Sequence, residues 1–554
     1  MSTNIKYAYP YPSYKRKNYV LLSDGWTLNG KEISLPFPPQ SSLSLYGGEI
    51  GKRLEYNLNF TVSDNFYPVK AGKKAVLKFG AVDQIAEIYL NGKFVFKHEG
   101  GYLPFEIDVT EILEKENSLL VVAFDALDKT YPYGKQKKKP GGMWYTEVSG
   151  VWQSVVLEEQ GKSTIKSVYF TPEQDGVNVK IDCEKECLVI VTLPSGKAIE
   201  EKIKSEKFVK IPSGEIELWS PDSPRLYSVK ILSDNDEVET YFALRTIEKR
   251  EVNGKTLVFL NGKPIFLSCV LDQGYFEKGI FLPENADEWE KDVDRMKSLG
   301  FNCIRKHIKI EPQFFYEACD RKGMLVIQDM VNSGDYRYVS QTVLPTIGLK
   351  FAIDKKIFST KRREFFIRHA VETVKHLYNH PSIFCWTIFN EGWGQFNSDK
   401  VYGIIKTADK TRLIDSTSGW FKQKKSDFLS EHIYFHNREL KGKKGKILFL
   451  SECGGYGRLI ADHARPRKNY GYGKISQTEE ELTEKFVLLV EKMLVPSLKN
   501  GLSGFVYTQL SDIEDEINGL YTYDREVLKI NREKVKSTLE YLNGEFLKAN
   551  GFIE

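Results

Sequence analysis

The stretch that decides the fold is Ile383-Phe-Cys-Trp-Thr-Ile-Phe-Asn-Glu391, which is followed by Gly392-Trp393-Gly394. Apart from Thr387 it is apolar up to its last two residues, Asn390 and Glu391. An apolar run of this length, rich in β-branched and aromatic residues, predicts a strand that is buried on both faces. The carboxylate therefore stands at the C-terminal tip of the strand, where a parallel barrel has its active site.

A second stretch repeats this design in Ile447-Leu-Phe-Leu-Ser-Glu452-Cys453-Gly454-Gly455. It is again an apolar run that ends in a glutamate. Glycoside hydrolases use a pair of carboxyl groups, and two strand tips could supply them here. The alternative is that each glutamate merely caps its strand or pairs with a nearby arginine.

After Arg245 the pattern alternates strands with long amphipathic helices, which is typical of βα units. Helices are expected at Glu284–Leu299, through Phe366 to Leu377, and around Phe486–Leu494. The expected strands are Ile265–Leu271, Asn302–Arg305, Met324–Asp329, Ile383–Glu391, Arg412–Ser416, Phe428–Phe435, Ile447–Glu452 and Gly504–Leu510. Eight strands in about 300 residues predict a (β/α)8 TIM barrel.

Polar residues end nearly every one of these strands, and the tips of a parallel barrel converge on one pocket. The substrate-binding candidates are Asn390, Tyr434, Asp272, Arg305, His307, His432, Trp393, Trp420 and Gln509. Trp393, Trp420 and Trp144 are candidate sugar platforms, with packing in the barrel rim as the alternative. The convergence, rather than any single residue, is the evidence for a site.

The chain before the barrel reads as two β domains. Up to residue 160, short strands such as Leu54–Val62 and Val151–Leu157 are separated by turns such as Asn91-Gly92, which predicts a jelly-roll sandwich. From 161 to 246 about seven strands, among them Ile216–Trp219, suit an immunoglobulin-like sandwich. Residues 247–554 then form the barrel domain.

One loop of the first domain, from Lys129 to Val148, carries Tyr131, Tyr133, Trp144 and Tyr145. It either reaches over a neighbouring active site or packs on itself at the surface. The same loop holds the short basic run Lys135-Gln136-Lys137-Lys138-Lys139, for which a solvated loop is the expected environment.

The composition favours a soluble protein without a nucleic-acid or membrane partner. The 79 Lys and Arg against 75 Asp and Glu of the 554 residues give a net charge of only +4. The seven cysteines are mostly scattered singly in apolar strands, which fits a reducing, cytoplasmic compartment, and none completes a metal-ligand pattern. Neither a signal peptide nor a membrane span is expected. A homo-oligomer is possible.

The same residues resemble glycoside hydrolase family 2, which includes β-galactosidases, β-glucuronidases and β-mannosidases. The resemblance covers nearly the whole chain. The stretches that carry it are Pro12–Trp26, Asn91-Gly92-Lys93, Gly100–Thr110, Gly150-Val151-Trp152, Leu218–Tyr227, His380–Glu391 and Leu450–Gly454. Of these, His380-Pro381-Ser382-Ile383 through Asn390-Glu391 is similar to the family's acid/base signature and is the most specific.

The sequence departs from the family pattern at several positions. Cys453 stands where the nucleophile strand usually has an aromatic residue. Arg305 and His307 are two residues apart instead of the usual three. Where glucuronidases carry an Asn-x-Lys motif for the sugar carboxylate, this chain has Glu516-Ile517-Asn518. The metal ligands and extra C-terminal domains of the largest β-galactosidases find no match, and no cofactor is expected.

The resemblance implies a retaining exo-β-glycosidase in which Glu452 is the nucleophile and Glu391 the acid/base, which requires a raised pKa for Glu391. Asn390 would then bind the sugar 2-hydroxyl and Tyr434 would hydrogen-bond Glu452. Because no cation occupies the glucuronidase position, the expected substrate is a neutral glycoside, with β-galactoside first and β-glucuronide as the alternative. The remaining alternatives are a transglycosylase that uses the same residues and a non-catalytic carbohydrate-binding protein.

Overall fold

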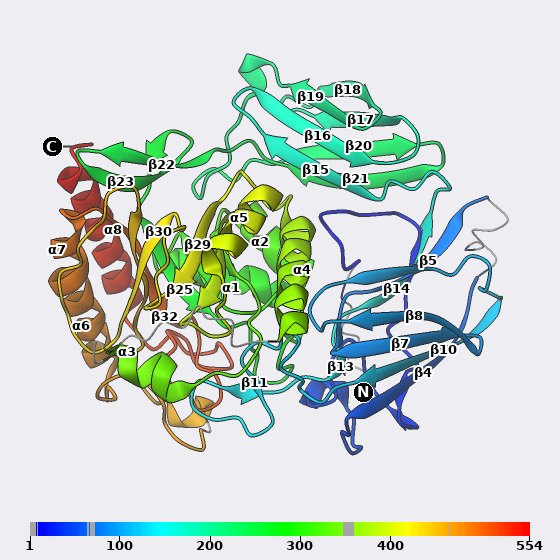
Figure 1. The fold of residues 1–554 in the computed structure, drawn as a ribbon, viewed down its shortest axis with the longest axis horizontal. Coiled ribbons are helices and arrows are strands. Elements are labelled where there is room, and N and C mark those ends of the chain that lie inside the picture. The colour runs from blue at the N-terminus through cyan, green and yellow to red at the C-terminus, as the bar shows by residue number, and fades with distance from the viewer. Residues whose placement is uncertain are drawn as a thin grey trace.

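A computed structural model of the chain describes residues 7, 9–63, 66, 72–346, 349, 359–464 and 466–553. Figure 1 shows a barrel with surrounding helices, an N-terminal β-sandwich beside it and a second β-sandwich above both. The predicted fold class, two β-sandwiches followed by a TIM barrel, is confirmed. No helix in the described part of the chain has the length and apolar character to span a membrane.

The barrel is one parallel eight-stranded sheet with the strand order β29-β28-β27-β26-β25-β32-β31-β30. Its strands are β25 (Leu267–Asp272), β26 (Cys303–Lys306), β27 (Leu325–Asp329), β28 (Ile383–Asn390), β29 (Leu413–Ser418), β30 (Phe428–Ile433), β31 (Ile447–Gly454) and β32 (Leu502–Thr508). All eight predicted strands are present, with ends shifted by a few residues. Each element agrees with the apolar run that predicted it.

Backbone and side-chain hydrogen bonds close the barrel between β29 and β30, the two end strands of the sheet. The backbone N–H of Ile414 donates to Asp427 Oδ2 at 2.9 Å, and Asp427 N–H donates to the carbonyl of Ile414 at 2.9 Å. Farther along, Ser418 Oγ and His432 Nε2 lie 2.9 Å apart. The seam therefore leads directly to the C-terminal edge of the barrel, where the two glutamates stand.

Helices cover the outside of the barrel. They are α1 (Asp287–Ser298), α2 (Gln313–Lys322), α3 (Leu344–Thr346), α4 (Thr360–Leu377), α5 (Ser398–Ala408), α6 (Glu479–Leu489), α7 (Val495–Leu498) and α8 (Arg532–Ala549), with π-helical turns at Val339–Val343 and Val490–Leu494. All three predicted helices are present. Loops rather than helices follow β29 and β30 at residues 419–427 and 434–446.

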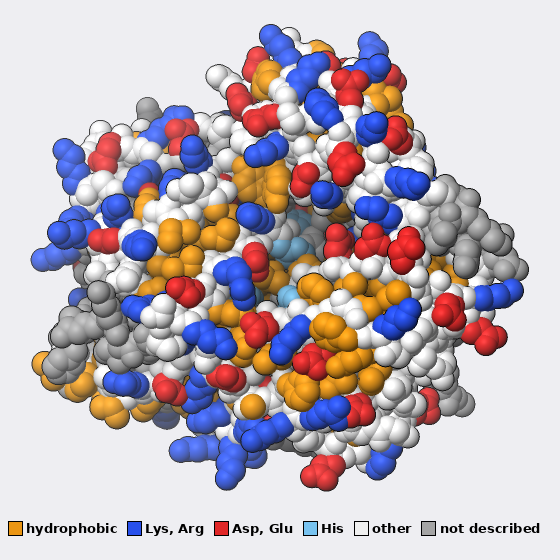
Figure 2. All heavy atoms as spheres, turned by 45° about the vertical axis from the view of Figure 1, so that its right-hand side comes forward, with side chains coloured by type: hydrophobic (Ala, Val, Ile, Leu, Met, Phe, Trp, Pro, Cys, Tyr) orange, Lys and Arg blue, Asp and Glu red, His pale blue; other side chains and the backbone are white. Residues whose placement is uncertain are grey.

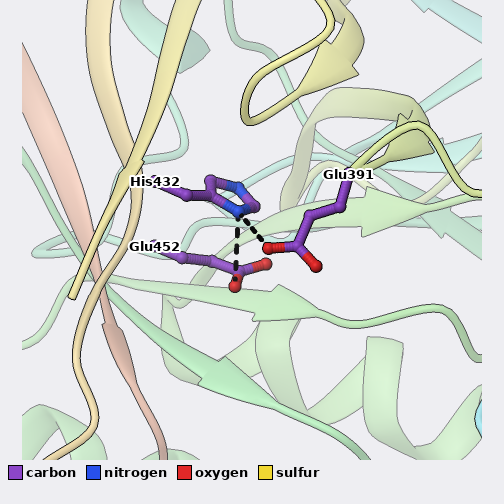
Figure 3. A group of neighbouring side chains, drawn as sticks. All are labelled: Glu391, His432 and Glu452. Atoms are coloured by element: carbon purple, nitrogen blue, oxygen red, sulfur yellow. Dashed lines mark hydrogen bonds and ion pairs between the residues drawn. The ribbon is translucent and has the colours of Figure 1, made fainter. Parts of the chain in front are cut away.

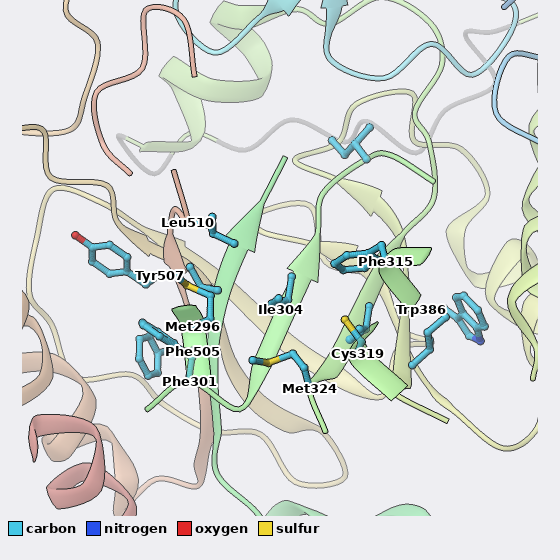
Figure 4. Close-up of a cluster of buried hydrophobic side chains, with 14 of the residues drawn as sticks. Met296, Phe301, Ile304, Phe315, Cys319, Met324, Trp386, Phe505, Tyr507 and Leu510 are labelled. Carbon is cyan, nitrogen blue, oxygen red and sulfur yellow. The ribbon is translucent and has the colours of Figure 1, made fainter. Parts of the chain in front are cut away.

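The core between helices and strands is built from the apolar faces that the periodicity predicts. Met296 of α1 packs with Ile304 of β26 and Phe505 of β32, and all three are fully buried (Figure 4). Each such side chain contributes about 1.5–3 kcal/mol through burial. This rigid core fixes the strand tips on which the site depends.

The N-terminal sandwich has a four-stranded sheet, β1-β14-β5-β9, and a six-stranded sheet, β3-β2-β4-β10-β7-β8. Their bounds are β1 Tyr19–Leu21, β2 Thr27–Leu28, β3 Lys31–Glu32, β4 Arg53–Thr61, β5 Lys74–Phe79, β7 Ile85–Leu90, β8 Lys93–Glu99, β9 Phe105–Asp108, β10 Glu116–Phe124 and β14 Val155–Gln160. The predicted strand at 151–157 is divided, because β13 (Gly150–Val151) pairs with β6 (Val82–Asp83) before β14 begins.

The second sandwich has seven strands in two sheets, β15-β16-β19 and β18-β17-β20-β21. They are β15 Ser167–Pro172, β16 Gly176–Asp182, β17 Cys187–Thr192, β18 Ala198–Ile203, β19 Glu206–Lys210, β20 Tyr227–Ser233 and β21 Asp236–Phe242. The predicted strand Ile216–Trp219 is wrong, because only Leu218 forms a single bridge, with Leu244. The edge strand β18 was missed because its largely exposed sequence lacks an apolar run.

A small sheet of β22 (Ile247–Val252), β23 (Lys255–Leu260) and β24 (Lys263–Pro264) links the second sandwich to the barrel. The space-filling view in Figure 2 shows basic and acidic side chains interspersed over one face, which agrees with the small net charge. Histidine side chains are visible in a hollow near the middle of that face.

Candidate active site

Glu391 and Glu452 lie side by side at the C-terminal edge of the barrel (Figure 3). Glu391 follows the last residue of β28, and Glu452 lies near the end of β31. One oxygen of each carboxylate lies within 4.8 Å of the other. Retaining glycosidases hold their two carboxyl groups about 5–5.5 Å apart, whereas inverting enzymes need about 6.5–9.5 Å for an intervening water. The spacing therefore matches the retaining arrangement.

The backbone aims Glu391 into the pocket through an unusual conformation. Its φ of 51° lies in the left-handed region, which a residue with a side chain adopts at a cost of about 1–3 kcal/mol. Its N–H donates to the carbonyl of Ser418 at 3.0 Å, and the N–H of Trp393 closes the following turn onto Asn390 at 2.8 Å. These bonds hold the strained residue in place.

Positive groups surround Glu452. Arg305 Nη1 donates to its Oε1 at 3.1 Å, and the hydroxyl of Tyr434 donates to its Oε2, as predicted. Burial alone would raise the pKa of Glu452, but its neighbours, His432 and Arg305 foremost, lower that pKa to about 2. The arrangement keeps Glu452 ionised, which is the state required of a nucleophile.

Arg305 organises the floor of the pocket. Its Nε and Nη2 bind the two carboxylate oxygens of Asp329 at 3.0 and 2.9 Å, and Nη2 also donates to Asn390 Oδ1 at 2.8 Å. This leaves the Asn390 amide nitrogen without a hydrogen bond to any described residue, free to donate to a ligand. Asp329 was expected at a strand tip, but not as the anchor of Arg305.

His307 faces the same floor as a neutral acceptor. Its Nδ1 lies 2.8 Å from Asp329 Oδ2, and its side chain is buried. Burial lowers the pKa of His307 well below its ordinary value, so the ring is neutral at neutral pH. Because the carboxylate of Asp329 can only accept, Nδ1 carries the proton and Nε2 is the acceptor.

His432 and Tyr336 hold Glu391 from two sides. His432 Nδ1 lies 2.8 Å from Oε1 of Glu391 and 3.5 Å from Oε2 of Glu452, so the imidazole bridges the two carboxylates (Figure 3). The hydroxyl of Tyr336 donates to Oε2 of Glu391 at 3.2 Å. His432, a predicted substrate-binding residue, contacts Glu391, and its contact with substrate stays a prediction. Tyr336 was missed because nothing in its local sequence marks it.

Several other candidates have polar groups that are bonded to other parts of the protein. Asp272 forms a buried ion pair with Lys306, and the indole rings of Trp393 and Trp420 are buried with their N–H groups bonded to backbone carbonyls. Burial favours the packing alternative for both tryptophans. Gln509 donates to Glu516 Oε2 at 2.7 Å and to Asn518 Oδ1 at 2.9 Å, which makes it part of the pocket wall.

The aromatic loop of the N-terminal sandwich reaches this pocket. Tyr133 N–H donates to the carbonyl of Asn332 at 3.0 Å, and Tyr145 donates to Glu516 Oε2 at 2.7 Å. The half-buried ring of Trp144 packs edge-on against Trp393, with centroids 5.0 Å apart. The alternative of a self-packed surface loop is therefore wrong.

Two groups of side chains in the described part of the chain have the spacing to hold a metal ion. One is Glu391, His432 and Glu452 itself, and the other is His463, Asp524 and Glu526 nearer the surface. In the first group, the Nδ1 atom that would bind a metal is already hydrogen-bonded to Glu391. That no metal is needed stays a prediction.

Comparison with known families places two segments of the chain. Residues 251–444 match the model described as glycosyl hydrolases family 2, TIM barrel domain. Residues 48–159 match the model described as glycosyl hydrolase 2 galactose-binding domain-like. The first segment covers the barrel from β25 to β30, and the second lies within the first sandwich.

Among curated relatives, the chain is 26% identical over 478 residues to a β-galactosidase of Thermoanaerobacter pseudethanolicus, covering 80% of this chain and 58% of that protein. It is 27% identical over 387 residues to a putative β-glucuronidase of Formosa agariphila, covering 64% of this chain and 33% of that protein. The chain thus spans only part of the length of these relatives.

Among solved structures, the fold matches a β-D-glucuronidase of Dictyoglomus thermophilum with a TM-score of 0.73 at 18% identity, over 97% of this chain and 98% of that one. It also matches a β-galacturonidase of Eisenbergiella tayi with a TM-score of 0.69 at 20% identity, over 96% and 97% of the two chains. At this identity the likeness establishes the shared fold.

Proposed function

This chain belongs to glycoside hydrolase family 2, and on that premise we propose that it is a retaining exo-β-glycosidase. The observation that carries the proposal is the pair of carboxylates with oxygens within 4.8 Å of each other on two strand tips. The two carboxylates have different contacts. Glu452 is surrounded by positive groups that keep it ionised, whereas Glu391 is held by a tyrosine and a histidine.

In the first step, an oxygen of Glu452 attacks the anomeric carbon while Glu391 gives its proton to the leaving glycosidic oxygen. The C–O bond to the aglycone breaks and a glycosyl ester of Glu452 forms. Arg305 binds Oε1 of Glu452 and Tyr434 donates to Oε2. These two donors orient the nucleophile toward the sugar.

In the second step, Glu391 takes a proton from a water molecule, which attacks the anomeric carbon and releases Glu452. Two inversions give net retention. The free amide nitrogen of Asn390 donates to the sugar 2-hydroxyl, a contact that strengthens in the transition state. Because Arg305 holds the other end of this amide at 2.8 Å, its orientation is fixed before substrate binds.

We propose a neutral sugar, with β-galactoside as the first choice. Each basic residue that was weighed as a partner for a sugar carboxylate is engaged elsewhere: Arg305 with Asp329 and Glu452, Lys306 with Asp272 and Glu311. His307 is neutral. A buried anion without a partner costs several kcal/mol, so the uncharged Asn518, at the position where glucuronidases carry a lysine, supports a neutral substrate.

We predict that a panel of nitrophenyl glycosides in both anomeric series will show turnover of β-anomers only, with the β-galactoside preferred over the β-glucuronide in kcat/KM. The early product, followed by NMR, should have the β configuration. An α-configured first product would contradict the retaining mechanism. A tenfold preference for the glucuronide would contradict the neutral sugar.

The low pKa of Glu452 leads to a pH prediction. Because this pKa is about 2, the nucleophile stays ionised throughout the working range, and kcat/KM should show no acid limb from it above about pH 3. The same low pKa also makes the stability of the folded state depend on pH. The depressed pKa contributes stability that is complete above about pH 5 and is lost as the pH falls toward 2. An acid limb near pH 5 in a protein that circular dichroism shows to be folded would contradict this.

Two alternatives use the same site. A transglycosylase would pass the glycosyl group to an alcohol instead of water, and product analysis with an added alcohol acceptor separates the two. A non-catalytic sugar-binding protein would bind but not turn over the panel.

All seven cysteines are unpaired, which supports the proposed reducing compartment.

A further inference from the structure

We propose that Lys135, carried by the aromatic loop of the N-terminal sandwich, is a substrate-binding residue that works with Glu516 to bind hydroxyl groups of a neutral sugar. The inference rests on the proposed function and names residues that select its substrate class. The sequence predicted a solvated lysine run here. Lys137, Lys138 and Lys139 are indeed exposed, but Lys135 is half-buried at the edge of the pocket.

The backbone on both sides of Lys135 is fixed by contacts with other segments, so Lys135 does not lie in a freely moving surface loop. On one side, Gly134 has a φ of 68°, and a side chain there would come within 3.0 Å of the carbonyl of Ile308. On the other side, Gln136 is buried and donates to Asp83 and to Tyr102, both at 3.1 Å. The carbonyl of Lys135 itself accepts from Tyr145 N–H at 3.0 Å.

The ammonium group of Lys135, in contrast, has no hydrogen bond or ion pair with the part of the chain that the structure describes. Its charge acts on three groups of the pocket. It contributes to lowering the pKa of Glu452, opposes the burial that raises the pKa of Glu516, and adds to the burial that lowers the pKa of His307. The geometry supports this, because the carbonyl of Lys135 bonds Tyr145, whose hydroxyl bonds Glu516 at 2.7 Å, so the uncommitted cation belongs to the same cluster as Glu516.

Glu516 offers the complementary acceptor. It is buried, and both hydrogen bonds to its side chain, from Tyr145 and Gln509 at 2.7 Å each, go to Oε2. Oε1 accepts none from the described residues, and it is not among the enclosed atoms that lack a partner. A donor at Lys135 and an acceptor at Glu516 match the donor and acceptor character of sugar hydroxyls.

The same pair disfavours a sugar carboxylate. A sugar carboxylate beside Glu516 would share the ammonium of Lys135 with Glu516 and Glu452. Two carboxylates close together force one of them to take up a proton. A neutral sugar needs no such change. The proposal therefore commits to a hydroxyl-bearing, uncharged sugar.

The test compares Lys135→Met and Lys135→Arg with Lys139→Met, an exposed lysine of the same loop. Galactose and galacturonate binding are measured by calorimetry, and kcat and KM are measured on the nitrophenyl β-galactoside. We expect Lys135→Met to weaken galactose binding and lower kcat/KM by about 10- to 100-fold, the size of a hydrogen bond to a charged group. Lys135→Arg should recover part of the loss, and Lys139→Met should match the wild type.

Galactose binding can be measured whether or not the protein turns over glycosides. It therefore tests the role of Lys135 separately from the proposed function. Galactose binding that is equal in Lys135→Met and Lys139→Met would overturn the role of Lys135. Tighter wild-type binding of galacturonate, lost in Lys135→Met, would overturn the neutral sugar class. If Lys135→Met proves misfolded by circular dichroism, Lys135→Gln is judged by the same criteria. An acid limb of kcat/KM that moves to higher pH in Lys135→Met would further support a charge acting on Glu452.

Discussion

Replacing Glu452 with Gln should abolish turnover, with kcat reduced by about 10⁴-fold or more. The amide is nearly isosteric but is a very weak nucleophile, so no glycosyl-enzyme forms. The environment that keeps Glu452 ionised then works against the variant, because Arg305 Nη1 faces an uncharged group instead of a carboxylate 3.1 Å away. The measurement is kcat on the best nitrophenyl glycoside, together with circular dichroism to show that the barrel is folded.

Adding azide tests directly whether the missing function of Glu452→Gln is that of the nucleophile. A small anion can enter the space beside Arg305, attack the anomeric carbon from the side that Glu452 occupied, and leave a glycosyl azide of inverted, α configuration. Glu391 still protonates the leaving oxygen in that reaction. Glu431→Gln is the matched control, because Glu431 lies on the adjacent strand β30 and pairs with Lys422 outside the pocket. If Glu452→Gln retained a tenth of wild-type activity, another residue would have to be the nucleophile.

The sequence was sufficient for the parts of this molecule that depend on local pattern. Apolar runs that end in a polar residue located both glutamates, and the alternation of short strands with helices located the remaining barrel strands. Ile383–Glu391 shows why, since a strand buried on both faces is nearly all apolar until it emerges at the rim, here with Thr387 as the one exception. The hydrogen bond from Tyr434 to Glu452 followed from the family resemblance.

The parts that the sequence did not predict depend on contacts between distant segments. Tyr336 lies in a loop, and only the folded chain brings its hydroxyl to Glu391 across 55 positions. Lys135 belongs to a lysine run whose other members are solvated, and it differs from them because Gly134 and Gln136 anchor the backbone against the barrel and the sandwich. His432 was assigned to substrate because a strand-tip histidine gives no indication of whether its ring faces the sugar or the acid/base.

Replacing Glu391 with Gln should separate substrates by their leaving groups. A dinitrophenyl glycoside needs little protonation, so its first step should proceed within about tenfold of the wild-type rate, as kcat/KM reports. Glycosides with poor leaving groups should lose about 10²–10⁴-fold, the usual contribution of a general acid. Since the variant also lacks the base for the second step, the glycosyl-enzyme on Glu452 should accumulate and give a burst of dinitrophenol followed by a slow steady state.

The contacts of Glu391 give this prediction its control. Tyr336→Phe removes the 3.2 Å hydrogen bond to Oε2 and the hydrogen bond with Thr342 but keeps the Glu391 carboxylate, so it should lower activity far less than Glu391→Gln and should produce no burst. Azide should shorten the slow phase of Glu391→Gln, because an anionic nucleophile needs no general base, and the product should be the β-glycosyl azide. The two variants Glu391→Gln and Glu452→Gln would then yield azides of opposite configuration from the same substrate. Equal losses on good and poor leaving groups would mean that the proton comes from a residue other than Glu391.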